Sequence, residues 1–190
     1  AEPGRYADRL SVNLEIAKEE NLKRLAPDKD HPSVFKPMSY ISQGFLESAE
    51  NRRRLRHAPR FAPAGQSTQM IVGATDESDR EILTLSTALY GRPSMKRVYY
   101  SGYIPVNSYD NRLPALKQAP LVRENRLYQA DWLMRFYGFR SDEIVDDSYP
   151  DLDLEIDPKL SWALRHPERF PVDVNQADYE LILRIPGIGV

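Results

Sequence analysis

Apolar and polar residues alternate strictly in the stretch Arg9-Leu10-Ser11-Val12-Asn13-Leu14-Glu15-Ile16. A period of two places the apolar side chains on one face of a β-strand and Ser11, Asn13 and Glu15 on the other. The stretch therefore predicts a strand whose apolar face packs on a core. Its polar face either meets water or lines a pocket that could bind a ribose.

Helical and extended patterns alternate after this strand. We expect regular elements in the following order: a helix over residues 17–26, a helix over 33–57, a strand over 66–74, a helix after the capping box of Ser78 and Glu81, a strand over 97–105 and a helix over 121–137. Gly44 allows a break in the second helix. Strands separated by helical crossovers favour parallel pairing. The expected class is α/β, either an open parallel sheet or about half of an eight-stranded barrel.

The composition changes after Arg140. Eight Asp and Glu residues between 141 and 157 predict a solvated acidic linker, and Asp157-Pro158 predicts the start of a short helix. We expect Asn175 to cap a further helix. The chain is therefore divided into a sheet domain over residues 1–140, a linker over 141–157 and a helical segment over 158–190.

Composition excludes several classes of site. The 190 residues carry 26 Lys and Arg against 28 Asp and Glu, so any nucleic-acid binding must come from a local surface. Because cysteine is absent, the chain cannot ligate a zinc ion or an iron–sulfur cluster through thiolates. The three histidines are scattered and are expected at the surface, so no metal site is assigned. No apolar run approaches the ~18 residues of a membrane span, and we expect a cytoplasmic protein without a membrane partner.

Three local patterns bear on binding. Gly73, Asp76 and Glu77 lie where a strand passes into a helix, which is the ligand-binding end of α/β folds, although turns use the same residues. A group of arginines (Arg52, Arg53, Arg54, Arg56 and Arg60) is usually a solvated helix face, with contact to a nucleic-acid backbone as the alternative. The alternating tyrosines Tyr99, Tyr100 and Tyr103 are expected in the core.

The chain ends in Pro186-Gly187-Ile188-Gly189-Val190 after a helical pattern. This tail resembles the first helix and hairpin of a helix-hairpin-helix motif, with the second helix missing. Glycines let the backbone approach a DNA phosphate, whose oxygens accept from the hairpin amides. An ordinary glycine turn is the alternative.

Taken together, the segments resemble the second half of a radical S-adenosylmethionine (SAM) barrel, and in particular the DNA modification/repair radical SAM proteins linked to uracil-DNA glycosylase. The resemblance lies in residues 7–15, 66–74, 98–103, 120–124, 126–133 and 171–175 together with the tail. It implies that residues 1–140 form half of a TIM-type barrel of parallel strands with helical crossovers. A truncated helix-hairpin-helix would follow in residues 158–190.

The resemblance also implies a set of binding residues. Asn13 and Glu15 would hold the SAM ribose, and Ile71 and Gly73 would lie beside the adenine with Asp76 or Glu77 as the trailing acid. Tyr103 and Ile104 would contact or stack on the adenine. DNA would bind to the tail residues Pro186, Gly187, Ile188 and Gly189. No catalytic residue is assigned.

The chain departs from this family in one large respect. Radical SAM chemistry requires a Cys-x-x-x-Cys-x-x-Cys motif that holds a [4Fe-4S] cluster, and the cluster cleaves SAM to a 5′-deoxyadenosyl radical. Since this chain lacks the cysteines, the early strands that would carry them and the second helix of the hairpin motif, we expect a fragment that is truncated at both ends and inactive alone. The alternative is a non-catalytic DNA-binding or scaffold module on an α/β half barrel. A different barrel enzyme with phosphate chemistry would need a glycine-rich phosphate loop, which is absent.

Overall fold

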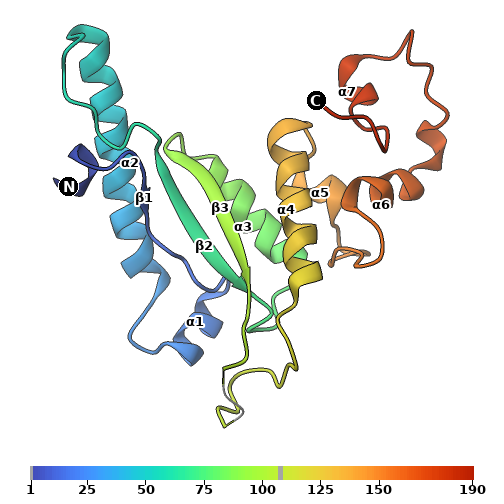
Figure 1. The fold of residues 1–190 in the computed structure, drawn as a ribbon, viewed down its shortest axis with the longest axis horizontal. Coiled ribbons are helices and arrows are strands. Elements are labelled where there is room, and N and C mark those ends of the chain that lie inside the picture. Colours follow the sequence, from blue (N-terminus) through green and yellow to red (C-terminus); the bar gives the residue numbers. More distant parts are fainter. Residues whose placement is uncertain (1, 107–108) are drawn as a thin grey trace. The chain divides into compact units, whose positions relative to one another are not determined.

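A computed structural model describes residues 2–106 and 109–190 (Figure 1). Its elements, in chain order, are η1 (Glu2–Arg5), β1 (Leu10–Ser11), α1 (Glu19–Leu25), α2 (His31–Arg54), β2 (Gln66–Val72), α3 (Asp79–Tyr90), β3 (Met95–Gly102), α4 (Leu121–Phe136), α5 (Ser141–Ile144), α6 (Pro158–Arg165), η2 (Pro167–Arg169) and α7 (Tyr179–Ile182).

The chain forms two compact units. The sheet unit contains the residues up to Glu77 and Leu85–Ala119, and the helical unit contains Ser78–Thr84 and Pro120–Val190. Helix α3 therefore contributes its first turns to the helical unit and its last turns to the sheet unit. The predicted boundary at residue 140 lies inside the helical unit.

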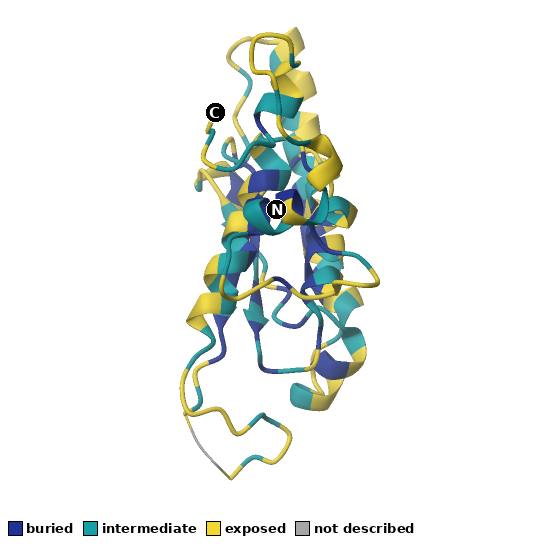
Figure 2. Cartoon of the chain, turned by 90° about the vertical axis from the view of Figure 1, so that its right-hand side faces the viewer, coloured by how far each residue is buried: buried dark blue, intermediate teal, exposed yellow. Residues whose placement is uncertain are grey.

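The sheet unit is built on three parallel strands in the order β1-β2-β3. This arrangement confirms a mixed α/β class with a small parallel sheet. Met70 of β2 lies opposite Tyr100 of β3. The residues of the two longer strands are mostly buried or half-buried (Figure 2).

Helices α2 and α3 pack on the same face of this sheet. Gln66 of β2 donates from Nε2 to the Met38 carbonyl of α2 at 3.2 Å, and the Tyr100 hydroxyl lies 2.9 Å from Ser86 Oγ of α3. Gln66 and Met70 share a face because they are four residues apart, and Met70 pairs with Tyr100. The opposite face carries the polar residues Ser67 and Gln69 and, on β3, Tyr99.

The first predicted strand is present but interrupted by a bulge. Leu10 and Ser11 pair with Gln66 and Ser67, and Glu15 then forms a bridge to Met70. Four steps along the first strand thus oppose three steps along β2, which leaves one residue unpaired. Inside the bulge the Leu14 amide donates to Thr68 Oγ1 at 3.0 Å. The predicted alternation survives where it matters for packing, because Leu14 and Ile16 are buried and Asn13 is exposed.

Helix α2 runs without a break through Gly44, so the break that this glycine allows does not occur. Gly44 instead allows another side chain to approach the helix closely. A Cβ at this position would lie 2.8 Å from the ring of Phe61, which packs against the helix. At the other end of α2, Asp30 and Ser33 form a reciprocal capping box.

The helical unit is organised around Trp162 of α6, whose side chain is 1% exposed. Its ring lies 5.3 Å from that of Phe139 and stacks on His166 at 4.6 Å. Asp157 caps α6 as predicted, accepting from two amides at 3.0 Å. The prediction of Asn175 as a helix cap is wrong, because Asp178 caps α7 by accepting from the Leu181 amide at 2.7 Å.

The acidic segment of the helical unit is held by hydrogen bonds to the start of α3. The buried carboxylate of Asp79 accepts from Arg123 Nε at 2.7 Å and from the Leu152 amide at 2.9 Å. Asp151 in turn accepts from the Asp79 amide at 2.9 Å. Burial raises the pKa of Asp79, and Arg123 opposes that rise.

Candidate functional site

The residues predicted to bind SAM follow the strands of the sheet unit at one edge. Because β2 and β3 run parallel to the first strand, Glu15, Gly73 and Tyr103 all come after strand residues at the carboxyl edge. Side chains from all three segments meet there. Ile16, Ala74 and Tyr103 form a buried cluster with Leu22 of α1, and Ile71 packs against it. Carboxyl edges are where parallel sheets bind ligands.

Glu15 has a backbone conformation that is unusual for a residue with a side chain. Its φ is +68°, held by hydrogen bonds from its amide to the Gln69 carbonyl (3.0 Å) and from the Ile71 amide to its own carbonyl (2.7 Å). A left-handed conformation costs about 1–2 kcal/mol for an L-residue. Its carboxylate lies 3.7 Å from Lys29 Nζ and remains partly exposed. Strain of this kind gathers at functional sites.

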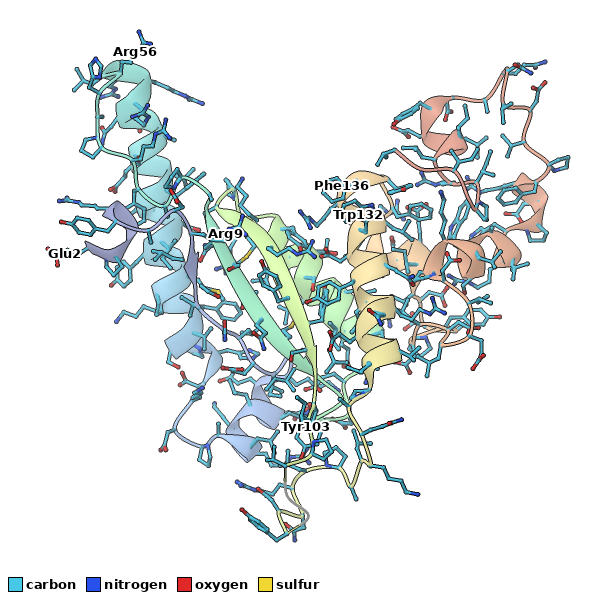
Figure 3. All side chains as sticks on the ribbon, in the orientation of Figure 1. Glu2, Arg9, Arg56, Tyr103, Trp132 and Phe136 are labelled. Atoms are coloured by element: carbon cyan, nitrogen blue, oxygen red, sulfur yellow. The ribbon has the colours of Figure 1, made fainter. Side chains whose placement is uncertain are left out.

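Tyr103 brings a buried polar group to the same edge. The residue is 9% exposed, and its hydroxyl has no hydrogen-bond partner among the described residues. A buried hydroxyl without a partner is unfavourable unless a ligand or water supplies one. Figure 3 shows Tyr103 just beyond the end of β3, and the next residue, Ile104, is exposed.

Asp76 and Glu77, the two predicted acids, differ in their surroundings. Asn21 of α1 donates from Nδ2 to Asp76 Oδ1 at 2.8 Å and to Glu77 Oε1 at 2.9 Å. Glu77 is buried and also accepts from Thr75 Oγ1 and the Lys18 amide, so it ties α1 to the turn after β2. Asp76 is exposed, and the hydrogen bond from Asn21 lowers its pKa. Of the two acids, Asp76 is the one that is open to a ligand.

Asn21 belongs to no motif that predicts its role from the sequence. The residue is buried and sits in the middle of a short helix. Its role depends on the turn at 75–77, which is more than fifty positions away. An asparagine among charged helical residues was the only available signal.

The remaining predicted residues of this set occupy less decisive positions. Gly73 has φ +82°, which a residue with a Cβ adopts only with strain. Asn13 is exposed, and its Oδ1 accepts from Ser11 Oγ at 3.1 Å. The prediction of buried tyrosines is correct for Tyr100 and Tyr103 and wrong for Tyr99, which is 40% exposed on the face opposite α2 and α3.

The histidines contact main-chain carbonyls or solvent. His31 Nε2 lies 3.1 Å from the Ile16 carbonyl, His166 Nδ1 lies 2.8 Å from the Trp162 carbonyl, and His57 is exposed. Within residues 2–106 and 109–190, no three potential ligands gather as a metal site would require.

The predicted DNA-binding tail belongs to the helical unit. Gly187 has φ +86°, and the Ile188 amide donates to the Ile185 carbonyl at 3.1 Å, which makes a glycine turn after α7. Lys159 Nζ donates to the Ile188 carbonyl at 2.5 Å, and burial lowers the pKa of this lysine. A cavity of about 440 Å³ lies between Gly187, Ile188 and Gly189, the start of α6, and Trp132 of α4.

The residues predicted to bind SAM and the tail thus belong to two separate candidate sites, one in each compact unit. Of the described helices, none combines the length and the apolar character needed to cross a membrane. No protein-family model matches the chain, and no curated protein or solved structure matches it.

Proposed function

We propose that the chain is part of a cytoplasmic radical SAM enzyme that modifies or repairs DNA, and that the sheet unit holds SAM. One observation carries the proposal: Glu15, Gly73 and the unpartnered hydroxyl of Tyr103 gather at the carboxyl edge of a parallel sheet. This is the edge at which α/β proteins bind ligands.

The winding of the sheet unit supports a half barrel. Strands in the order β1-β2-β3 with α2 and α3 on one face are typical of a barrel wall. A doubly wound sheet places helices on both faces. The polar face with Ser67 and Gln69 would then line the barrel interior.

The residues present fit SAM in chemical type. The Glu15 carboxylate accepts hydrogen bonds as a ribose requires, and the Asn13 amide both donates and accepts. The Tyr103 hydroxyl would gain the partner that it lacks, and Asp76 would accept from the exocyclic amine of adenine. Ile71 and Ile104 would pack on the base beside Gly73, which has no side chain. SAM would supply the sulfonium centre, and these residues would bind and orient the nucleoside.

The [4Fe-4S] cluster does not fit this chain. The 190 residues include no cysteine and therefore provide none of the three thiolates. For these residues the proposal is limited to holding SAM and contacting DNA. The link to uracil-DNA glycosylase is a functional partnership within the same proposal.

The tail is the proposed DNA contact. In its glycine turn, formed by Pro186, Gly187, Ile188 and Gly189, the Gly187 and Gly189 amides would donate to a phosphate, since the Ile188 amide already donates to the Ile185 carbonyl. Lys159 places a cation within hydrogen-bonding distance of the same turn. These two features support a single phosphate contact, completed by a second helix in a full helix-hairpin-helix.

Titration of the 190-residue chain with SAM by isothermal calorimetry tests the proposal. We expect saturable binding that weakens at least tenfold in Glu15→Gln and in Asn13→Ala. Glu19→Gln on α1 is the matched control, because it removes the same charge from an exposed carboxylate, and it should bind SAM as the wild type does. A folded wild-type chain without saturable binding would refute the assignment.

The alternative is a non-catalytic DNA-binding or scaffold module. The absence of cysteine favours it. It predicts salt-sensitive DNA binding together with no affinity for SAM, so the same titration separates the two functions.

A further inference from the structure

The positive charge of the sheet unit is concentrated at one end. The unit carries 17 Lys and Arg against 12 Asp and Glu. Five of the arginines fall between positions 52 and 60, a stretch that contains no acid. The nearest acids in sequence are engaged already, since Glu50 pairs with Arg54 at 2.7 Å and Glu47 accepts from Gln43 at 2.8 Å.

The segment that carries these arginines is ordered by hydrogen bonds to α2. After the helix ends, the chain turns back along it. Arg52 Nη1 donates to the Ala58 carbonyl at 2.8 Å. Ser48 Oγ then donates to the Pro59 carbonyl and accepts from the Phe61 amide, both at 3.1 Å. Arg56 and Arg60 are therefore displayed on a fixed turn.

A cation from the sheet joins the same end. Lys96 at the start of β3 places Nζ 5.5 Å from the centre of the Phe45 ring of α2. We call Arg53, Arg54, Arg56, Arg60 and Lys96 the basic end. All five side chains belong to exposed residues. Figure 3 shows Arg56 at the tip of α2.

Two members of the basic end, Arg56 and Arg60, have no structural role that accounts for them. The side chains of Arg53, Arg56 and Arg60 form no ion pair or hydrogen bond with any described residue. Cations in the last turn of a helix interact favourably with the helix dipole, and this interaction accounts for Arg52, Arg53 and Arg54. That effect fades within a turn and does not explain Arg56 or Arg60.

We propose that the basic end binds the phosphate backbone of a nucleic acid. The guanidinium group donates two parallel hydrogen bonds to a phosphate, and the segment from 52 to 60 uses arginine at every cationic position. Arginine side chains carried on a fixed turn suit a rigid polyanion such as a nucleic-acid backbone. Attraction to an anionic membrane works equally well with lysines on a mobile segment.

This surface is distinct from the candidate SAM site. Helix α2 returns the chain from the carboxyl edge of the sheet to its amino edge, and its 24 residues span about 36 Å. The basic end and Tyr103 therefore lie at opposite ends of the sheet unit (Figure 3). The inference shares only the class of partner with the proposed function, and it stands if SAM binding fails.

Fluorescence anisotropy with a labelled 20-base-pair DNA duplex tests the inference, using the full 190-residue chain between 50 and 300 mM KCl. Arg56→Gln/Arg60→Gln removes two phosphate contacts, so we expect the slope of log K against log salt to fall by about 2. Lys36→Gln/Lys117→Gln removes the same charge from exposed positions of the same unit, and it should leave the slope unchanged. Arg56→Lys/Arg60→Lys should recover most of the slope.

Three outcomes would overturn the inference. They are no binding of the duplex by the wild type at 50 mM KCl, equal losses in the two glutamine pairs, and preferential binding to phosphatidylcholine vesicles with one-fifth phosphatidylserine. If Arg56→Gln/Arg60→Gln fails to fold, hydrogen exchange of the wild type with and without DNA replaces it. Protection at residues 52–61 is then expected, and its absence counts against the proposal.

Discussion

The two compact units use arginine for opposite purposes. In the helical unit, acids outnumber bases by 16 to 9. Most of its arginines form ion pairs with carboxylates, namely Arg80, Arg123, Arg135, Arg140, Arg165, Arg169 and Arg184. At the basic end of the sheet unit, Arg53, Arg56 and Arg60 form none with the described residues. The same residue type therefore consolidates one unit and is displayed by the other.

The difference follows from what surrounds each guanidinium. Arg165 is 15% exposed, donates to Asp146 at 3.1 Å and to the Ile144 carbonyl at 2.6 Å, and lies over the Tyr149 ring. Hydrogen bonds from the Tyr149 and Ser148 amides, together with Arg165, lower the pKa of Asp146. Arg56 is exposed, and its side chain forms no hydrogen bond or ion pair with the described residues. Stability should therefore respond to the first arginine and binding to the second.

The largest effect should come from the core of the helical unit. Trp162→Ala removes a fully buried ring and should lower the free energy of unfolding by about 3–5 kcal/mol. Trp132→Ala, at a position 46% exposed, should cost under about 1 kcal/mol. Urea denaturation measures both. Hydrogen exchange of Trp162→Ala would sharpen the comparison, because we expect exchange to accelerate more in the helical unit than in β2 and β3. Equal acceleration in both would mean that the two units unfold together.

Removal of a consolidating arginine should rank second. Arg165→Ala leaves Asp146 and the Ile144 carbonyl without their charged donor, so we expect a loss of about 2–3 kcal/mol. Arg140→Ala, which breaks an exposed pair with Asp142, should leave the unfolding free energy near that of the wild type. If Arg165→Ala and Arg140→Ala unfolded at the same urea concentration, the difference in burial would not explain how much each arginine contributes to stability.

Substitution of Glu15 in the sheet unit should have a smaller effect on stability, and glycine should be stabilising relative to alanine there. Because glycine adopts φ +68° without strain, Glu15→Gly should be about 1 kcal/mol more stable than Glu15→Ala. Both variants should lose SAM binding, since both lack the carboxylate. Paired urea curves and calorimetric titrations measure the two quantities. A glycine variant no more stable than the alanine variant would show that the bulge holds residue 15 without strain.

The smallest effect on stability should come from the basic end. Arg56→Ala removes no hydrogen bond or ion pair and should change the free energy of unfolding by less than about 0.5 kcal/mol. DNA affinity should nevertheless fall. A stability loss comparable with that of Arg165→Ala would place Arg56 among the consolidating arginines and remove the contrast.

Local patterns were enough to predict much of the sheet unit. The alternation before Ile16 and the capping box of Ser78 and Glu81 are readable because their determinants lie within a few residues, and the structure contains both. The bulge before Glu15 was not predictable. It depends on Thr68 Oγ1, which is 54 positions from the Leu14 amide that it binds.

Long-range packing explains the other differences. Asn175 and Asp178 are both good helix caps, and the sequence alone offered no way to choose between them. Gly44 is a helix breaker by composition, yet the ring of Phe61 needs the space that it leaves. At the candidate site, the family resemblance predicted Glu15, Gly73 and Tyr103 as SAM contacts, and the parallel strands bring them to one edge. The sequence could not show that Asn21 joins Asp76 to Glu77, because that contact exists only after the turn has folded onto α1.

The turn held by Ser48 and Arg52 also makes the basic end a sensor of local unfolding. Trypsin cleaves after arginine, but a protease needs an extended stretch of chain, and the hydrogen bonds to Ala58, Pro59 and Phe61 keep this stretch folded back on α2. The cleavage rate after Arg56 therefore reports how often the turn opens by itself, independently of global unfolding. A Ser48→Ala variant would be cut faster while melting almost as the wild type does.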